Sequence, residues 1–115
     1  MTPMLNGNMY TYEMAPCFSL MEKQIFEYMK VKIGWNEIDG IMTPGGSFAN
    51  FMAIELSRYH CFPESKLKGI QNLPKLKMLI SDASHYSLKK GAIMCGIGID
   101  SIINIKTNEF GQMDP

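Results

Sequence analysis

The stretch MLISDASHYSLKKGAIMCGIGIDSIINIK, residues 78–106, decides the fold class of this chain. Residues 78–80 form a short apolar run between polar residues, and this pattern predicts a buried strand. Residues 84–95 carry apolar side chains at helical spacing and are followed by glycines, which predicts a helix. Residues 101–106 contain three isoleucines and predict another buried strand. This order favours two parallel strands joined by a right-handed crossover.

Two further helices and one short strand are predicted upstream of this unit. Apolar residues at steps of three and four predict a helix over residues 16–33, with Gly34 as its left-handed C-terminal cap. Residues 40–43 are short and apolar enough to predict a very short strand. A second apolar stripe predicts a helix over residues 48–59, which ends before a surface loop at residues 63–75.

The alternation of helices and strands along the chain predicts an α/β fold, with a parallel-type sheet and flanking helices. Three short strands make a small sheet whose two edges would both be open. A parallel sheet normally has both of its faces covered by helices. We therefore expect this chain to be part of a larger α/β domain.

Composition and charge exclude several classes of function. Lys plus Arg equals Asp plus Glu, 11 each, and this balance argues against binding to nucleic acid, which favours a surplus of cations. No stretch approaches the roughly 18 apolar residues of a membrane span. The three cysteines are widely spaced and form no CxxC pair, so we expect no metal site. Free thiols and the absence of a secretory signal pattern predict a cytoplasmic protein.

The first candidate site is Gly45-Gly46-Ser47, between the predicted short strand and a helix. A helix N-terminus offers free N–H donors and the positive end of the helix dipole, and glycine lets an anion approach the backbone closely. Ser47 could add a hydroxyl donor, and Asn50 lies one turn further into the helix. The alternative interpretation is a tight turn with a serine N-cap. The segment has neither the P-loop nor the GxGxxG pattern.

The second candidate site is Ser84-His85-Tyr86-Ser87, which follows the predicted strand at residues 78–80. By itself, His85 is more typical of a surface or helix-capping histidine. Its position strengthens the functional interpretation, because ligands of open parallel sheets bind outside the carboxyl ends of the strands. Gly46, Ser47 and His85 each follow a predicted strand, so all three are expected at this edge of the sheet.

Taken in order, several segments of the chain resemble one known family. They are Asn8-Met9-Tyr10-Thr11-Tyr12-Glu13-Met14-Ala15-Pro16, Ile33-Gly34-Trp35, Asp39-Gly40-Ile41, Pro44-Gly45-Gly46-Ser47 with Asn50, Ser84-His85-Tyr86-Ser87 with Lys89-Lys90, and Asn108-Glu109-Phe110-Gly111. These segments resemble the group II decarboxylases that depend on pyridoxal 5'-phosphate (PLP), in the glutamate decarboxylase and cysteine sulfinate decarboxylase branch. The likeness runs over nearly the whole chain with compatible spacing.

This resemblance implies a PLP-dependent transferase of fold type I, like aspartate aminotransferase. Residues 1–115 would be an incomplete N-terminal part of its PLP-binding large domain. Gly46 and Ser47 would contact the PLP phosphate, and Asn50 would support that loop. His85 would stack on the pyridine ring and is the catalytic candidate. The family's Schiff-base lysine and the aspartate that pairs with the pyridinium nitrogen have no counterpart here, so the 115-residue chain alone is expected to be inactive.

The resemblance also bears on the substrate, a small acidic amino acid. Asn8 and Tyr10 would shape the substrate pocket, with Asn8 resembling the glutamate branch and Tyr10 the cysteine sulfinate branch. We expect L-glutamate, converted to GABA and carbon dioxide. Cysteine sulfinate or aspartate, giving hypotaurine or beta-alanine, is the alternative. The full-length protein is expected to be a cytoplasmic homodimer; a truncated chain that acts only through subunit association is the alternative of another class.

Overall fold

The structure is a computed structural model that describes residues 11–114. The chain divides into two compact units, one ending at Met42 and one beginning at Thr43. The first unit contains helix α2 (Pro16–Ile33), and the second contains all the other helices and strands. Among the described residues, no helix combines the length and the apolar character that crossing a bilayer would require.

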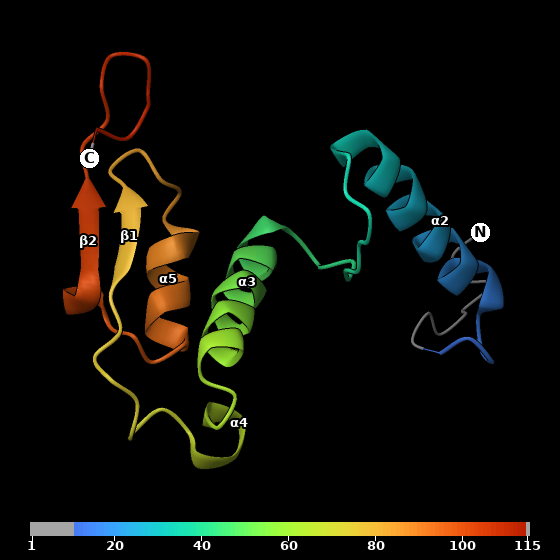
Figure 1. The fold of residues 1–115 in the computed structure, drawn as a ribbon, viewed down its shortest axis with the longest axis horizontal. Coiled ribbons are helices and arrows are strands. Elements are labelled where there is room, and N and C mark those ends of the chain that lie inside the picture. The colour runs from blue at the N-terminus through green and yellow to red at the C-terminus, as the bar shows by residue number, and fades with distance from the viewer. Residues whose placement is uncertain (1–10, 115) are drawn as a thin grey trace. The chain divides into compact units, whose positions relative to one another are not determined.

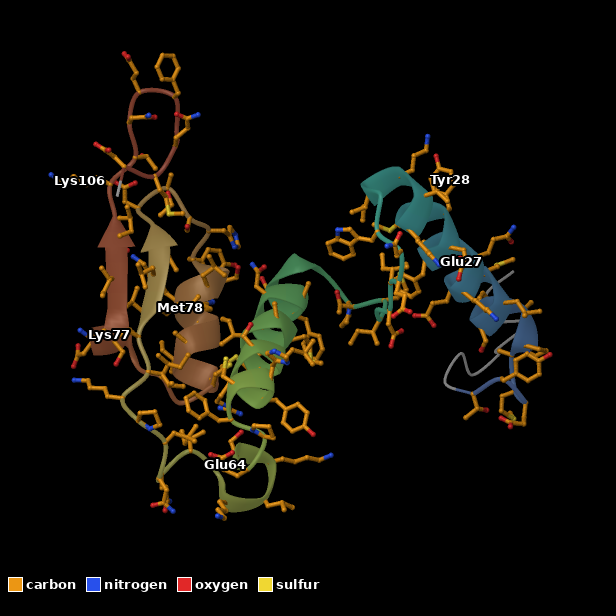
Figure 2. The ribbon with its side chains drawn as sticks, viewed as in Figure 1. Glu27, Tyr28, Glu64, Lys77, Met78 and Lys106 are labelled. Carbon is orange, nitrogen blue, oxygen red and sulfur yellow. The ribbon has the colours of Figure 1, made fainter. Side chains whose placement is uncertain are left out.

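Helix α2 confirms the helix predicted over residues 16–33. Pro16 occupies the first turn, and Gly34 ends the helix in the left-handed conformation with φ of 80°. The N–H group of Gly34 donates to the carbonyl oxygen of Lys30 at 3.0 Å. The apolar stripe that predicted this helix is largely exposed in this chain: Tyr28, which projects from α2 in Figure 2, is 63% exposed.

The prediction of a short strand at residues 40–43 is wrong. These residues have no regular secondary structure, because side chains bind the backbone donors that a strand would present to a neighbour. The N–H of Gly40 donates to the Asp39 carboxylate at 2.8 Å. The N–H of Met42 donates to Glu22 Oε1 of α2 at 3.1 Å. A backbone donor that is already satisfied locally gains nothing from pairing in a sheet.

The second unit contains the predicted strand–helix–strand segment. Its elements are α3 (Gly46–Cys61), α4 (Ser65–Lys68), β1 (Met78–Ser81), α5 (Ser87–Met94), the 3-10 turn η1 (Ile99–Ser101) and β2 (Ile102–Ile105). The helix predicted over residues 48–59 is confirmed and is slightly longer. The short helix α4 interrupts the loop predicted at residues 63–75.

Strands β1 and β2 form a two-stranded parallel sheet, with Met78 opposite Ile102 and Ser81 opposite Ile105. Figure 1 shows both arrows pointing the same way, with α5 connecting them along one face of the sheet. Ile80 of β1 and Ala92 of α5 are buried, whereas Leu79, on the opposite face of β1, is 64% exposed. The fold is therefore a partial α/β domain in which α5 covers one face of the sheet.

Helices α3 and α5 lie side by side and run in the same direction, opposite to that of the strands (Figure 1). Both helices therefore begin at the edge of the unit where the parallel strands end. This arrangement follows from the crossover, because α5 must return from the carboxyl end of β1 to the start of β2. Any site formed by the two helix N-termini lies at the carboxyl edge of the sheet.

Candidate functional site

The N-terminus of α3 presents free backbone donors. The helix has no side-chain cap, and Gly45 precedes it with φ of 104° and ψ of 161°. The N–H groups of Gly46 and Ser47 donate to no acceptor within residues 11–114, whereas those of Phe48 and Ala49 donate to the carbonyl oxygen of Gly45. Ser47 lies inside the helix, so the alternative interpretation of this residue as an N-cap is wrong.

The space in front of these donors is open. A Cβ atom placed on Gly45 or Gly46 would meet no other atom within 4 Å, and Gly46 and Ser47 are exposed. The positive φ of Gly45 turns the chain into the helix in a conformation that side chains with a Cβ atom rarely adopt. Free donors, the helix dipole and open space together suit a bound phosphate group.

The segment around His85 is a turn between β1 and α5. The helix predicted to begin at Ser84 begins instead at Ser87, because the preceding residues are held by Ser81. The N–H of Ala83 donates to the Ser81 hydroxyl at 3.1 Å, and the N–H of Ser84 donates to the carbonyl oxygen of Ser81 at 3.0 Å. His85 therefore lies in the turn, just outside the helix, with an exposed side chain.

A chain of hydrogen bonds joins the two candidate segments. Asn50 Nδ2 of α3 donates to the hydroxyl oxygen of Ser87 at 2.8 Å. The same oxygen lies 2.8 Å from His85 Nδ1, and the N–H of Ser87 donates to that ring nitrogen at 3.3 Å. Ser87 is 2% exposed, so the connection is shielded from water. Asn50 and His85 are thus linked through one buried serine.

The ring of His85 contacts the ring of Tyr86, which in turn contacts the cation of Lys90. The ring centroids of His85 and Tyr86 are 4.2 Å apart, with 42° between the ring planes. Lys90 Nζ lies 4.6 Å from the centroid of Tyr86, a cation–π distance. Tyr86 therefore contacts both the His85 ring and the Lys90 cation.

A second polar cluster lies in the C-terminal half of α3. Arg58 forms an ion pair with Glu55, and its Nη1 donates to the carbonyl oxygen of Cys95 at 2.7 Å. Burial, and secondarily the neighbouring Glu55 carboxylate, raises the pKa of the Cys95 thiol from an ordinary value of 9.0 to about 12. A thiol with this pKa is protonated at neutral pH, so it is a poor nucleophile and metal ligand.

The structure brings together Asn50 and His85, and it places Gly46 and Ser47 at the start of the helix that carries Asn50. Asn8 and Tyr10 lie outside the described residues. Within residues 11–114, no group of three metal-binding side chains is present. The sequence placed Gly45 and Ser87 within the two candidate segments but predicted no individual role for either residue.

The sequence model of the pyridoxal-dependent decarboxylase conserved domain matches residues 1–115. This chain belongs to the pyridoxal-dependent decarboxylase family. Membership confirms the family resemblance found in the sequence and implies pyridoxal 5'-phosphate as the cofactor. The free donors of Gly46 and Ser47 and the open space at Gly45 and Gly46 are compatible with the phosphate of that cofactor.

Known members of the pyridoxal-dependent decarboxylase family match almost the entire chain. Human cysteine sulfinic acid decarboxylase is 43% identical over 99% of this chain and 23% of its own length. The acidic amino acid decarboxylase GADL1 of Xenopus tropicalis is 44% identical over 99% of this chain and 22% of its own length. The chain thus spans less than a quarter of these relatives.

Solved structures of family members agree with the fold. The apo crystal structure of mouse CSAD is 42% identical, with a TM-score of 0.93 over 99% of this chain and 24% of that one. A second solved structure is the glutamate decarboxylase domain of diaminobutyrate-pyruvate transaminase and L-2,4-diaminobutyrate decarboxylase from Vibrio parahaemolyticus. It is 31% identical, with a TM-score of 0.80, and the match covers 96% of this chain and 26% of that one. The partial α/β fold predicted from the sequence is confirmed.

The identities with known proteins support the two substrates considered from the sequence to different degrees. The higher identities, 42–44%, belong to proteins named for cysteine sulfinic acid or for acidic amino acids. The domain named for glutamate is 31% identical. The family's decarboxylase chemistry is supported, and the comparisons favour the cysteine sulfinate alternative over the glutamate prediction.

Proposed function

We propose that this chain forms the phosphate-binding and ring-stacking edge of a PLP-dependent carboxy-lyase that acts on a small acidic amino acid. The observation that carries the proposal is the hydrogen-bonded connection from Asn50 through Ser87 to His85. It fixes the exposed histidine beside the helix whose first N–H groups are free. A cofactor that combines a flat ring with a phosphate group needs a stacking side chain and free N–H donors at one edge of a parallel sheet.

The N-terminus of α3 is the proposed phosphate site. Gly46 and Ser47 offer backbone donors, and the hydroxyl of Ser47 adds a side-chain donor. Gly45 contributes by its conformation, because the chain enters the helix through a positive φ that residues with a Cβ atom rarely adopt. Asn50 uses its amide to hold Ser87, so we assign it to supporting the site rather than to the phosphate itself.

His85 is the proposed stacking residue. Its ring is exposed, and the contacts with Ser87 and Tyr86 restrict its orientation. When bound, the cofactor acts as an electron sink for the charge left as carbon dioxide departs. The imidazole would hold one face of the cofactor ring in place and exclude water from it.

Cysteine sulfinate is the proposed substrate of the complete protein, which would release carbon dioxide and form hypotaurine. The identities of 42–44% with enzymes named for cysteine sulfinic or acidic amino acids support this choice. Glutamate is the second candidate, supported by the glutamate-like Asn8. Both substrates carry a second acidic group, and they differ in the chemistry of that group and in the length of the side chain that bears it.

The test is release of carbon dioxide by the complete protein that contains this segment, supplied with PLP and each of cysteine sulfinate, glutamate and aspartate. The highest kcat/KM is expected for cysteine sulfinate. His85→Ala should lower kcat by roughly a hundredfold, because a misaligned ring loses the favourable geometry of the reacting bond. The matched control is His60→Ala, which changes an exposed histidine of α3 and should leave kcat unchanged.

Two results would contradict the proposal. Wild-type turnover in His85→Ala would remove the stacking role. Unchanged PLP affinity in Ser47→Ala, where one hydroxyl donor is lost and the backbone donors are kept, would remove the Ser47 hydroxyl from the phosphate site, since that hydrogen bond should account for about a tenfold change. A preference for glutamate with normal effects of both variants would overturn only the choice of substrate.

A further inference from the structure

The most buried hydroxyl near the proposed site is that of Ser87, at the first position of α5. Its residue is 2% exposed, and its oxygen lies 2.8 Å from both Asn50 Nδ2 and His85 Nδ1. A buried polar group remains favourable only if its hydrogen-bonding capacity is used. Here both hydrogen-bond contacts of the hydroxyl are made with residues of the proposed site.

The direction of each hydrogen bond follows from the backbone. The N–H of Ser87 can only donate, and it points to His85 Nδ1 at 3.3 Å. His85 Nδ1 must therefore present a lone pair. The Ser87 hydroxyl accepts from the Asn50 amide, so its own proton is free to point to the same lone pair. In a neutral imidazole that accepts at Nδ1, the proton lies on Nε2.

The alternative tautomer would break this pattern. A proton on Nδ1 would face the N–H of Ser87 and would leave two donors in opposition. The Ser87 hydroxyl would have to turn away and accept from His85 while it also accepts from Asn50. Its proton would then have no partner among the contacts of this network, at a position that is almost completely shielded from water.

We propose that Ser87, oriented by Asn50, is a positioning residue that holds His85 as its Nε2–H tautomer with a fixed ring plane. The inference rests on the proposed function, in which His85 faces the cofactor ring. The fixed tautomer leaves the Nε2–H edge of the ring free, away from the network, and keeps the flat face available for stacking. Asn50 connects this arrangement to α3, so the phosphate site and the histidine ring keep a constant spacing.

The test uses the complete protein in its cofactor-free form, with histidine labelled by nitrogen-15. Comparison with a His85→Gln variant assigns the ring signals of His85. We expect a pyridine-like Nδ1 and a pyrrole-like Nε2 in the wild type. Ser87→Ala should show a larger share of the Nδ1–H tautomer, because it loses the hydroxyl contact at 2.8 Å and keeps only the longer backbone bond at 3.3 Å. Ser87→Thr, which keeps the hydroxyl, should restore the wild-type pattern. Asn50→Asp should shift the ratio toward Nδ1–H, since a carboxylate would attract the Ser87 proton.

Cofactor-loaded protein provides a second measurement. Ser87→Ala should reduce the circular dichroism induced in bound PLP and lower kcat by about tenfold, with KM for the substrate changed by less than about twofold. Ser87→Thr should recover most of the loss in kcat. A wild-type proton on Nδ1, or a Ser87→Ala variant with unchanged tautomer ratio and dichroism, would overturn the inference. Failure of the wild type to bind PLP would overturn the proposed function, while the cofactor-free spectra would still report on Ser87.

Discussion

Arg58 Nη1 lies 2.7 Å from the carbonyl oxygen of Cys95 and so ties the C-terminal half of α3 to the end of α5. The same guanidinium forms an ion pair with Glu55, one turn earlier on α3. The bond satisfies a carbonyl at a helix end, where no further helical N–H is available. Asn50 and Ser87 join the two helices at their N-termini. Helices α3 and α5 are therefore connected by polar contacts at both ends.

Arg58→Met should weaken the contact between α3 and α5. The substitution keeps most of the side-chain volume but leaves the Cys95 carbonyl and the Glu55 carboxylate without their donor. Loss of one partner from a partly buried hydrogen bond costs about 1–3 kcal/mol. The measurement is hydrogen exchange of the backbone amides in α5, which should become faster.

Arg58→Lys is the matched control, because it keeps the charge but cannot donate to both acceptors with the same planar geometry. We expect exchange rates between those of the wild type and Arg58→Met. Equal protection of α5 in all three proteins would show that the bond to Cys95 contributes nothing to the packing of the helices.

The Cys95 thiol should resist alkylation up to high pH. Its side chain is 2% exposed and its pKa is raised to about 12, whereas a cysteine in the unfolded chain has a pKa of 9.0. Labelling with iodoacetamide between pH 7 and 9, followed by mass spectrometry, should leave Cys95 unmodified in the folded protein. Addition of urea should make it reactive, which provides the control for access.

The raised pKa of Cys95 also predicts how the stability of the folded protein depends on pH. Between pH 9 and about 12 the folded protein retains the Cys95 proton while the unfolded chain loses it, so stability falls as pH rises through this range. Below pH 9 the thiol is protonated in both states and contributes no pH dependence. Cys95→Ala should reduce the slope of stability against pH in this range. An unchanged slope would show that other groups cause the alkaline loss.

Gly45→Ala should disturb the start of α3. The φ of 104° at Gly45 is rarely adopted by residues with a Cβ atom, and such strain costs about 1–3 kcal/mol. The donors of Gly46 and Ser47 would be aimed differently, so PLP affinity should fall together with stability. The measurements are PLP titration by absorbance and urea unfolding.

Gly46→Ala is the comparison for this effect. Gly46 lies in the first helical position and a Cβ atom there would meet nothing within 4 Å, so stability should be unchanged or slightly higher. PLP affinity should still fall if the phosphate approaches this backbone closely. Equal stability of the two variants would show that the positive φ at Gly45 is not required.

Much of this fold could be predicted because its signals are local. The helix over residues 16–33 was marked by its apolar spacing, Pro16 and Gly34, and each of these features acts within one turn of the chain. The two strands within residues 78–106 were marked by short apolar runs, and their parallel pairing followed from the helix between them.

The remaining features depend on contacts between distant residues. The false strand at residues 40–43 arose because the apolar pattern does not report that Glu22, about twenty residues away, binds the backbone of Met42. Ser87 was visible as part of the second candidate segment, but its role depends on Asn50, 37 residues earlier. His85 and Ser47 were selected by their positions after predicted strands, and their roles in binding the cofactor stay predictions.

Gly91 of α5 should tolerate alanine but not leucine, because α3 passes close to it. A Cβ atom at Gly91 would lie 2.6 Å from Cδ1 of Ile54 and 3.8 Å from the Cα atom of Phe51. In Gly91→Ala the end of the Ile54 side chain can rotate away, and alanine favours the helix by about 1 kcal/mol, so the net change in stability should be small.

Gly91→Leu would place further carbons against the backbone of Phe51, which cannot move without displacing α3. Overpacking of this kind costs about 1–3 kcal/mol, and separation of the helices should also lengthen the bond from Asn50 to Ser87. Urea unfolding and PLP titration should therefore both show a loss in Gly91→Leu. Lys89→Leu, on the exposed side of α5, is the control and should show neither. Normal PLP affinity in a destabilised Gly91→Leu protein would mean that the spacing of the two helices does not govern the cofactor site.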